Sequence, residues 1–158
     1  MQNQMVLAGL LLSSVLVGVT IGIVISVLWQ RERAKRFRVY HGIPNVIGRW
    51  RCTWFDDAQG QEQPKVEDTV EIQKWTTEGQ FLAVGHQPQF HLSYPIMGEI
   101  DASRVVTLVY KAARYPFEPN RGVAVLEMSR DGKTMDGRWY GRRSSTQLGG
   151  GLVRCVRL

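Results

Sequence analysis

Apolar and polar positions divide the chain into two parts that follow different periodicities. Residues 5–29 form a run of 25 residues without a charged side chain. A helix rises about 1.5 Å per residue and needs about 20 apolar residues to cross about 30 Å of hydrocarbon. The run therefore predicts one transmembrane helix, within residues 1–30.

After residue 38 the pattern changes to short runs that alternate with a period of two, which is typical of strands. Trp50, Cys52 and Trp54 share one face of the first run, and Asp68 shares a face with Val70 in the second. Alternation alone does not say which face is buried. Turn residues separate about eight expected strands, at 47–55, 66–75, 80–85, 90–100, 104–112, 122–128, 133–142 and 152–158.

Eight strands at regular spacing, with no helix between them, favour a mainly β fold. An up-and-down antiparallel barrel is the simplest solution because closure removes exposed sheet edges. A β-sandwich would fit the same pattern of strands. The expected organisation is a transmembrane helix at 1–30, a basic juxtamembrane linker at 31–43 and a cytoplasmic barrel domain at 44–158.

Charge on the two sides of the apolar run predicts its orientation. Residues 31–38 carry five basic and one acidic side chain, whereas residues 1–4 carry no charged side chain. The positive-inside rule then places the N-terminus outside and the barrel in the cytoplasm, with a single pass through the inner membrane and the basic segment against anionic lipids. A cleaved signal peptide would instead have its charges before the run and a small-residue cleavage site after it.

Two cysteines occur, at positions 52 and 155. A cytoplasmic domain should keep Cys52 and Cys155 as thiols. In an up-and-down barrel the first strand pairs with the last, so the two residues are expected on adjacent strands. Whether they are bonded is left open.

Small residues recur every four positions along the apolar run. They line one stripe of a helix, and such a stripe lets two helices approach closely in a membrane. Glycine and serine are also simply common in membrane helices. The stripe favours a homo-oligomer held by contacts at Ser14, Gly18, Gly22 and Ser26.

Catalytic and metal-binding motifs do not occur in the sequence. It has no G-x-S-x-G elbow, phosphate-binding loop or H-E-x-x-H pattern, so we expect no enzymatic activity and no cofactor. His86 and His91 are five residues apart with a proline between them, which is not a metal-ligand spacing.

Binding of a small anionic ligand is a more plausible role than catalysis. Residues 104–158 carry eleven basic and four acidic side chains, which suits either a solvated face or an anionic ligand, and no DNA or RNA is expected as a partner. Aromatic and arginine side chains on the strands could stack a base and hold phosphates. The candidates are Tyr94, Tyr110, Arg138, Tyr140 and Arg142.

The first strand has a family resemblance. Gly48-Arg49-Trp50 resembles the G-x-W signature of the lipocalin and calycin barrels. That resemblance implies that Trp50 closes the base of the barrel and that an arginine of the last strand covers its indole by a cation–π contact. Arg154 is the arginine expected in that role.

The whole arrangement resembles the membrane effectors of bacterial CBASS antiphage defence that have a β-strand-rich cytoplasmic domain. Residues 122–141 are similar to the glycine-rich hairpin of that group, although its members typically have two membrane helices and one is expected here. The resemblance implies a barrel that binds a cyclic nucleotide and helices that assemble to damage the inner membrane. An accessory subunit of a larger membrane complex and a lipocalin-like carrier of an apolar ligand are the alternatives.

Overall fold

A computed structural model describes residues 2–56, 63–76, 78–114, 118–142 and 148–158. The chain begins with one long helix, α1 (Gln2–His41), which continues without a break through the basic segment that follows the apolar run. Its described part includes one segment, within 15–41, that is long and apolar enough to span a membrane. Residues 31–41 are thus helical and form the last turns of α1.

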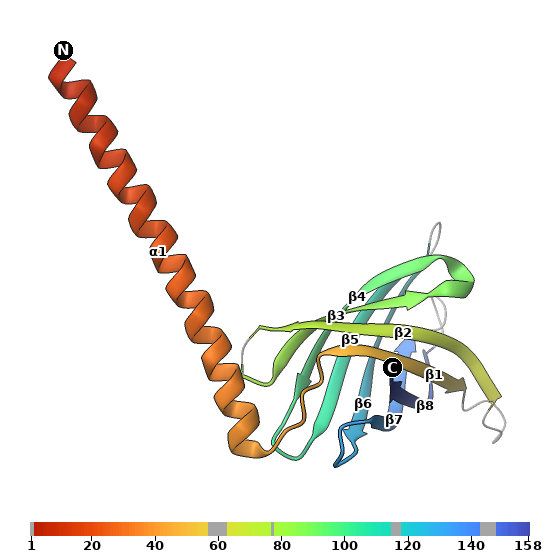
Figure 1. Ribbon diagram of the computed structural model, residues 1–158. Coiled ribbons are helices and arrows are strands. Elements are labelled where there is room, and N and C mark those ends of the chain that lie inside the picture. Colours follow the sequence, from red (N-terminus) through yellow and green to blue (C-terminus); the bar gives the residue numbers. More distant parts are fainter. Residues whose placement is uncertain (1, 57–62, 77, 115–117, 143–147) are drawn as a thin grey trace.

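Eight antiparallel strands follow and close into a barrel (Figure 1). Each strand pairs with its neighbours in chain order, and the first pairs with the last, so the expected up-and-down barrel is confirmed. A short 3-10 turn, η2 (Pro88–Phe90), connects the third and fourth strands. The strands are β1 (Gly48–Asp56), β2 (Gln63–Trp75), β3 (Gln80–Gln87), β4 (Leu92–Ile100), β5 (Val105–Arg114), β6 (Glu118–Met128), β7 (Thr134–Arg142) and β8 (Leu148–Arg157).

Closure decides which face of each strand is buried. Trp50, Cys52 and Trp54 point inward, and the residues between them are more exposed. The same alternation in β7 turns Met135 and Trp139 inward. The interior is a packed core of aliphatic and aromatic side chains in which successive strands interdigitate.

The base of the barrel, at the end where α1 arrives, is closed around Trp50. This side chain is fully buried together with Val46, whose carbonyl accepts a hydrogen bond from the indole Nε1 at 2.9 Å. The guanidinium of Arg157 lies 5.7 Å from the indole ring and donates to the carbonyls of Asn45 (2.8 Å) and Ile47 (2.9 Å). Trp50 thus lies at the closed base of the barrel, which is the position implied by the resemblance to the lipocalin and calycin barrels.

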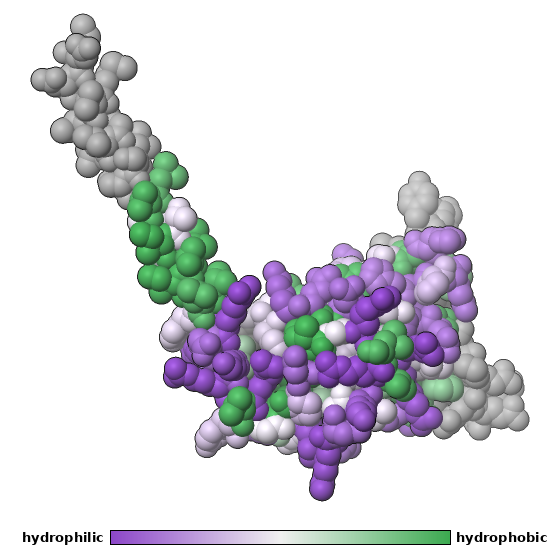
Figure 2. Space-filling model, viewed as in Figure 1, coloured by the Kyte–Doolittle hydropathy of each residue, from purple (hydrophilic) through white to green (hydrophobic). Residues whose placement is uncertain are grey.

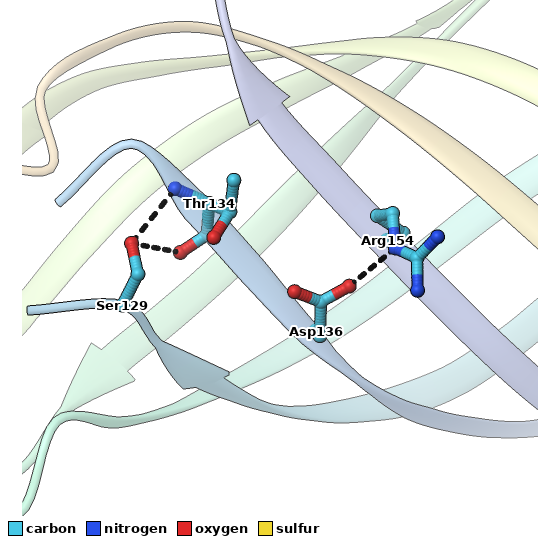
Figure 3. Close-up of polar contacts among 4 residues, drawn as sticks. All are labelled: Ser129, Thr134, Asp136 and Arg154. Atoms are coloured by element: carbon cyan, nitrogen blue, oxygen red, sulfur yellow. Dashed lines mark hydrogen bonds and ion pairs between the residues drawn. The ribbon is translucent and has the colours of Figure 1, made fainter.

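The arginine that covers Trp50 is not the expected one. In the β1–β8 register Arg157 lies opposite Trp50, whereas Arg154 lies opposite Thr53 and points outward. Figure 3 shows Arg154 on the neighbouring strand to Asp136, and its Nε lies 2.6 Å from a carboxylate oxygen of that residue. The prediction for Arg154 is therefore wrong, because Arg154 lies on the outer face of β8, whereas Arg157 lies three residues later on the face that Cys155 shares with Trp50.

The β6–β7 hairpin forms between the strands expected at 122–128 and 133–142, and its turn contains Asp131 and Gly132. The Ser129 hydroxyl accepts from the backbone N–H of Thr134 at 3.0 Å and donates to its carbonyl at 3.1 Å (Figure 3). Asp131 accepts from the Ser129 hydroxyl and from the Lys133 N–H, and these two bonds lower the pKa of its carboxyl. The turn thus holds β6 and β7 in register.

The two cysteines form a disulfide. Cys52 lies opposite Cys155 in the β1–β8 register, with 4.0 Å between their Cα atoms. The expectation that they lie on adjacent strands is confirmed, and the expectation of free thiols is wrong in this structure. Pairing of the first and last strands is the physical cause because it places the two sulfur atoms face to face.

We predict that Arg157→Ala destabilises the barrel by about 2 kcal/mol, because it removes two hydrogen bonds to carbonyls and a cation–π contact at the base. Arg154→Ala is the matched control, and its exposed ion pair should contribute less than about 0.5 kcal/mol. Urea unfolding of both variants measures the two effects. Equal losses would contradict the assignment of Arg157 to the base.

Candidate functional site

A carboxyl group is buried inside the barrel. Asp68 of β2 points into the interior and is only 2 % exposed, and it is the one charged side chain that is buried among the described residues. It lies opposite Cys52 in the β1–β2 register. A charged group in such a place needs partners, since an unpaired buried charge is costly.

Two side chains from β3 and β4 donate hydrogen bonds to one oxygen of this carboxyl. The hydroxyl of Tyr94 donates to Oδ2 of Asp68, and Nε2 of Gln87 donates to the same atom at 3.3 Å. The second oxygen, Oδ1, has no hydrogen-bond partner within the described part of the chain, and neither does the buried indole Nε1 of Trp54. Trp54 nevertheless acts on the Asp68 carboxyl from nearby, so a ligand at this place would accept from the Trp54 N–H and donate to Oδ1.

Burial raises the pKa of Asp68 from 3.8 to about 6. The hydrogen bonds from Tyr94 and Gln87 offset part of this rise, and Trp54 adds to their effect from a position outside hydrogen-bond geometry. Burial and the nearby carboxylate also raise the pKa of Tyr110 to about 12 and raise that of Tyr94 further. Both tyrosines are therefore neutral hydrogen-bond donors at neutral pH.

Aromatic rings surround this polar group. Trp54 lies edge-on to Tyr110 at 5.7 Å between ring centroids and to Trp139 at 6.4 Å, and Tyr94 lies 6.2 Å from Tyr110. Trp139 is held in place because its Nε1 donates to the carbonyl of Phe55 at 2.8 Å. We call Trp54, Asp68, Gln87, Tyr94, Tyr110 and Trp139 the interior cluster.

The interior cluster lies toward the end of the barrel opposite α1. Trp54 is near the end of β1, Gln87 ends β3, and Tyr94 is near the start of β4. Figure 1 shows α1 joining the barrel at the other end, where Trp50 closes the base. A ligand of the interior cluster would therefore enter from the end away from the helix.

The structure divides the five predicted ligand-binding residues into two groups. Tyr94 and Tyr110 belong to the interior cluster, whereas Arg138, Tyr140 and Arg142 point outward from β7. Tyr140 is 52 % exposed. The five residues therefore do not form one site, because the inward position of Trp139 turns its neighbours on β7 to the outer face.

The glycines beside Trp139 leave room for a protein side chain. A Cβ atom at Gly141 would stand 2.8 Å from the hydroxyl of Tyr110, and one at Gly122 would stand 2.2 Å from the same oxygen. The space holds the ring of Tyr110, which crosses from β5 over β6 toward β7.

The sequence did not indicate four residues of the interior cluster, namely Trp54, Asp68, Gln87 and Trp139. A signal for Asp68 was nevertheless present, since an acid occupied the face shared by Val70 and Ile72. No comparable signal existed for Gln87, which comes just before Pro88 at the end of β3. The described residues contain no group of acids, histidines or cysteines that could hold a metal ion.

A concave surface lies outside the barrel, where α1 meets the β2–β3 turn. It has a volume of about 340 Å³ and is lined by Trp29, Gln30, Arg33 and Glu78. Arg33 is already engaged there, with its Nε 2.7 Å from Glu78 and its guanidinium 4.6 Å from the ring of Trp29. This surface is therefore the junction between α1 and the barrel.

We predict that Asp68→Asn abolishes a pH dependence of stability. The pKa of Asp68 is about 6 in the folded protein, compared with an ordinary value of 3.8. The folded protein is therefore more stable below about pH 4, where the carboxyl is neutral, and it loses this stability as the pH rises through 6 and the carboxyl becomes charged. The shift corresponds to about 3 kcal/mol, so the variant should gain stability over the natural protein by up to that amount between pH 4 and 7.5. Thermal unfolding across this range, with Asp136→Asn on the outer face as control, measures it; parallel curves would contradict the prediction.

Comparison with known proteins gives no family for this chain. No protein-family model matches it, and no curated protein matches it significantly. Its function must therefore be inferred from the interior cluster and from the helix.

Proposed function

We propose that this protein is a membrane-anchored sensor whose barrel binds a small ligand at the interior cluster. The observation that carries the proposal is a buried carboxyl with one unpartnered oxygen beside an unpartnered indole N–H, both enclosed by aromatic rings. Buried polar atoms in native proteins are almost always hydrogen-bonded, and a binding role is one explanation for an exception. A ligand with both a donor and an acceptor would satisfy the two atoms together.

A nucleobase has the required chemistry. Its flat face can stack on an aromatic ring, its amino group can donate to Oδ1 of Asp68, and its ring nitrogens or carbonyls can accept from Trp54. A phosphate would be repelled by the ionised Asp68 and would have to lie farther out. Lys111 and Arg121, which face each other across β5 and β6 near this end of the barrel, are basic side chains that could attract it.

We infer that the ligand is a cyclic nucleotide, as the resemblance to CBASS effectors implies. In this proposal the base enters the barrel and the phosphates remain near its rim, where the basic second half of the domain contributes positive charge. Binding then promotes assembly of the helices, which disrupts the inner membrane in antiphage defence.

Titration calorimetry of the full chain in lipid nanodiscs, against a panel of cyclic di- and trinucleotides, tests the ligand. We expect one member of the panel to bind, and we expect Asp68→Ala to weaken it at least tenfold, because a hydrogen bond to a charged group contributes about 1.5–3 kcal/mol. Asp136→Ala is the control, since it removes the same group from the outer face. If no member binds, or if both variants bind alike, the proposed site is wrong.

Self-association of α1 is the second part of the proposal. The helix is exposed over the described side chains of its apolar run, and a Cβ atom at Gly18 or Gly22 would meet no atom within 4 Å. Ser26 lies on the same stripe, and the side chain of Ser14 lies outside the described residues. Two helices could therefore pack closely along this stripe.

The orientation of the protein is the third part. Figure 2 shows the hydrophobic surface of α1 giving way to hydrophilic residues where it meets the barrel, and five of these residues are Lys or Arg within 31–38. This flank supports a cytoplasmic barrel and an N-terminus outside the inner membrane. The Cys52–Cys155 bond is an observation against it, since disulfides are rare in the cytoplasm.

A fusion of green fluorescent protein to the C-terminus tests orientation and assembly in the same cells. Fluorescence is expected, because this reporter folds in the cytoplasm, and photobleaching steps count the copies in each spot. Gly18→Leu with Gly22→Leu should reduce the count to one, whereas Val19→Leu with Ile23→Leu, on a different face at the same spacing, should not. A dark fusion would place the barrel outside, and equal counts would exclude the stripe as the contact.

A further inference from the structure

An apolar strip crosses the outer face of three neighbouring strands. The register places Leu82 of β3 opposite Met97 of β4, and Met97 opposite Val109 of β5. Two residues along, Val84 lies opposite Pro95. Met97 is 66 % exposed and Val109 is 55 % exposed. We call these five residues the β3–β5 strip.

Charge is distributed unevenly around the barrel. Among the described side chains, β3, β4 and β5 carry two charged residues, Glu99 and Lys111. The opposite side, formed by β7, β8 and β1, carries more on its outer face. These are Arg49, Arg51, Asp136, Arg138, Arg142 and Arg154. One side of the barrel therefore presents a charged surface to solvent, whereas the side that carries the strip is more apolar.

The barrel is docked directly onto α1. Arg33 forms an ion pair with Glu78 of the β2–β3 turn, and the guanidinium of Arg38 lies 5.1 Å from the ring of Trp75. Ala34 is buried, and a Cβ atom at Gly79 would stand 3.3 Å from the ring of Phe37. Contacts on successive turns of the helix hold the barrel in one orientation relative to it.

This docking leaves little space between the barrel and the membrane. Trp29 has the place of an interfacial aromatic at the end of the apolar run, and Arg33 follows one turn later, about 6 Å along the axis. Figure 1 shows the barrel extending sideways from the end of α1, with β3 and β4 on the side toward which the helix rises. A bilayer around the apolar run would therefore face the outer side of β3 and β4.

We propose that the β3–β5 strip lies on the surface of the lipid bilayer that α1 crosses. The strip would bury its exposed apolar side chains among the headgroups, while the charged side of the barrel faces water and the basic turns of α1 contact anionic lipids. The interior cluster then opens parallel to the membrane surface. This proposal rests on the membrane anchor of the proposed function, and it is independent of the ligand.

Spin labels on the full chain in nanodiscs containing anionic lipid test the contact. Met97→Cys and Val109→Cys place a nitroxide on the strip, and Val156→Cys places it on β8, across the barrel from β4. Val156 is a matched control, since it is also an apolar side chain on the outer face and is 45 % exposed. The unsubstituted protein, whose two cysteines are bonded, gives the labelling background.

Accessibility to oxygen, which concentrates in lipid, is compared with accessibility to a water-soluble nickel chelate. We expect a higher oxygen-to-nickel ratio at positions 97 and 109 than at position 156. Equal, water-like ratios at all three positions in protein that co-purifies with the nanodisc would overturn the contact while leaving the anchor intact. Dipolar broadening confined to positions 97 and 109 would also overturn it, because it would assign the strip to a second copy of the chain. Protein that does not co-purify with the nanodisc would refute the anchor itself.

Discussion

Pairing of the first strand with the last is the constraint on which the rest of this structure depends. The β1–β8 register sets Cys52 against Cys155 and Trp50 against Arg157, so one pairing determines both the disulfide and the closed base. It also decides which face of every strand is interior, because a shift by one residue would turn the whole apolar set outward. The position of the buried carboxyl follows from the same choice.

Closure gives the barrel two different ends. Trp50, Val46 and the last turns of α1 occupy one end, and the interior cluster lies toward the other. A ligand at the cluster and a contact between helices are therefore separated by the length of the barrel. Any influence of one on the other must pass through the strands and through the contacts of Arg33 with Glu78 and of Arg38 with Trp75.

Much of the fold could be predicted from the sequence, since period-two alternation reports burial strand by strand. Eight strands and a barrel followed from it, but partners on distant strands did not. Arg154 and Arg157 are three residues apart and lie on opposite faces of β8, but only the pairing of β8 with β1 shows that Arg157 has the face and the position of Trp50. Likewise Tyr94, which donates to Asp68, comes 26 residues later, and no local pattern links the two. The candidate site depends on such pairings, which is why the sequence located only two of its residues.

The energetics of Asp68 favour a functional interpretation over a purely structural one. An apolar residue at this position would continue the face formed by Val70 and Ile72 without the desolvation that raises the pKa of the carboxyl to about 6. Tyr94 and Gln87 satisfy one oxygen only, so the hydrogen bonds of the folded chain offset the cost of burial in part. A position that served packing alone would gain from losing the charge. A position that binds a ligand must keep an unsatisfied acceptor in the unbound state, because that acceptor gives the ligand its differential interaction.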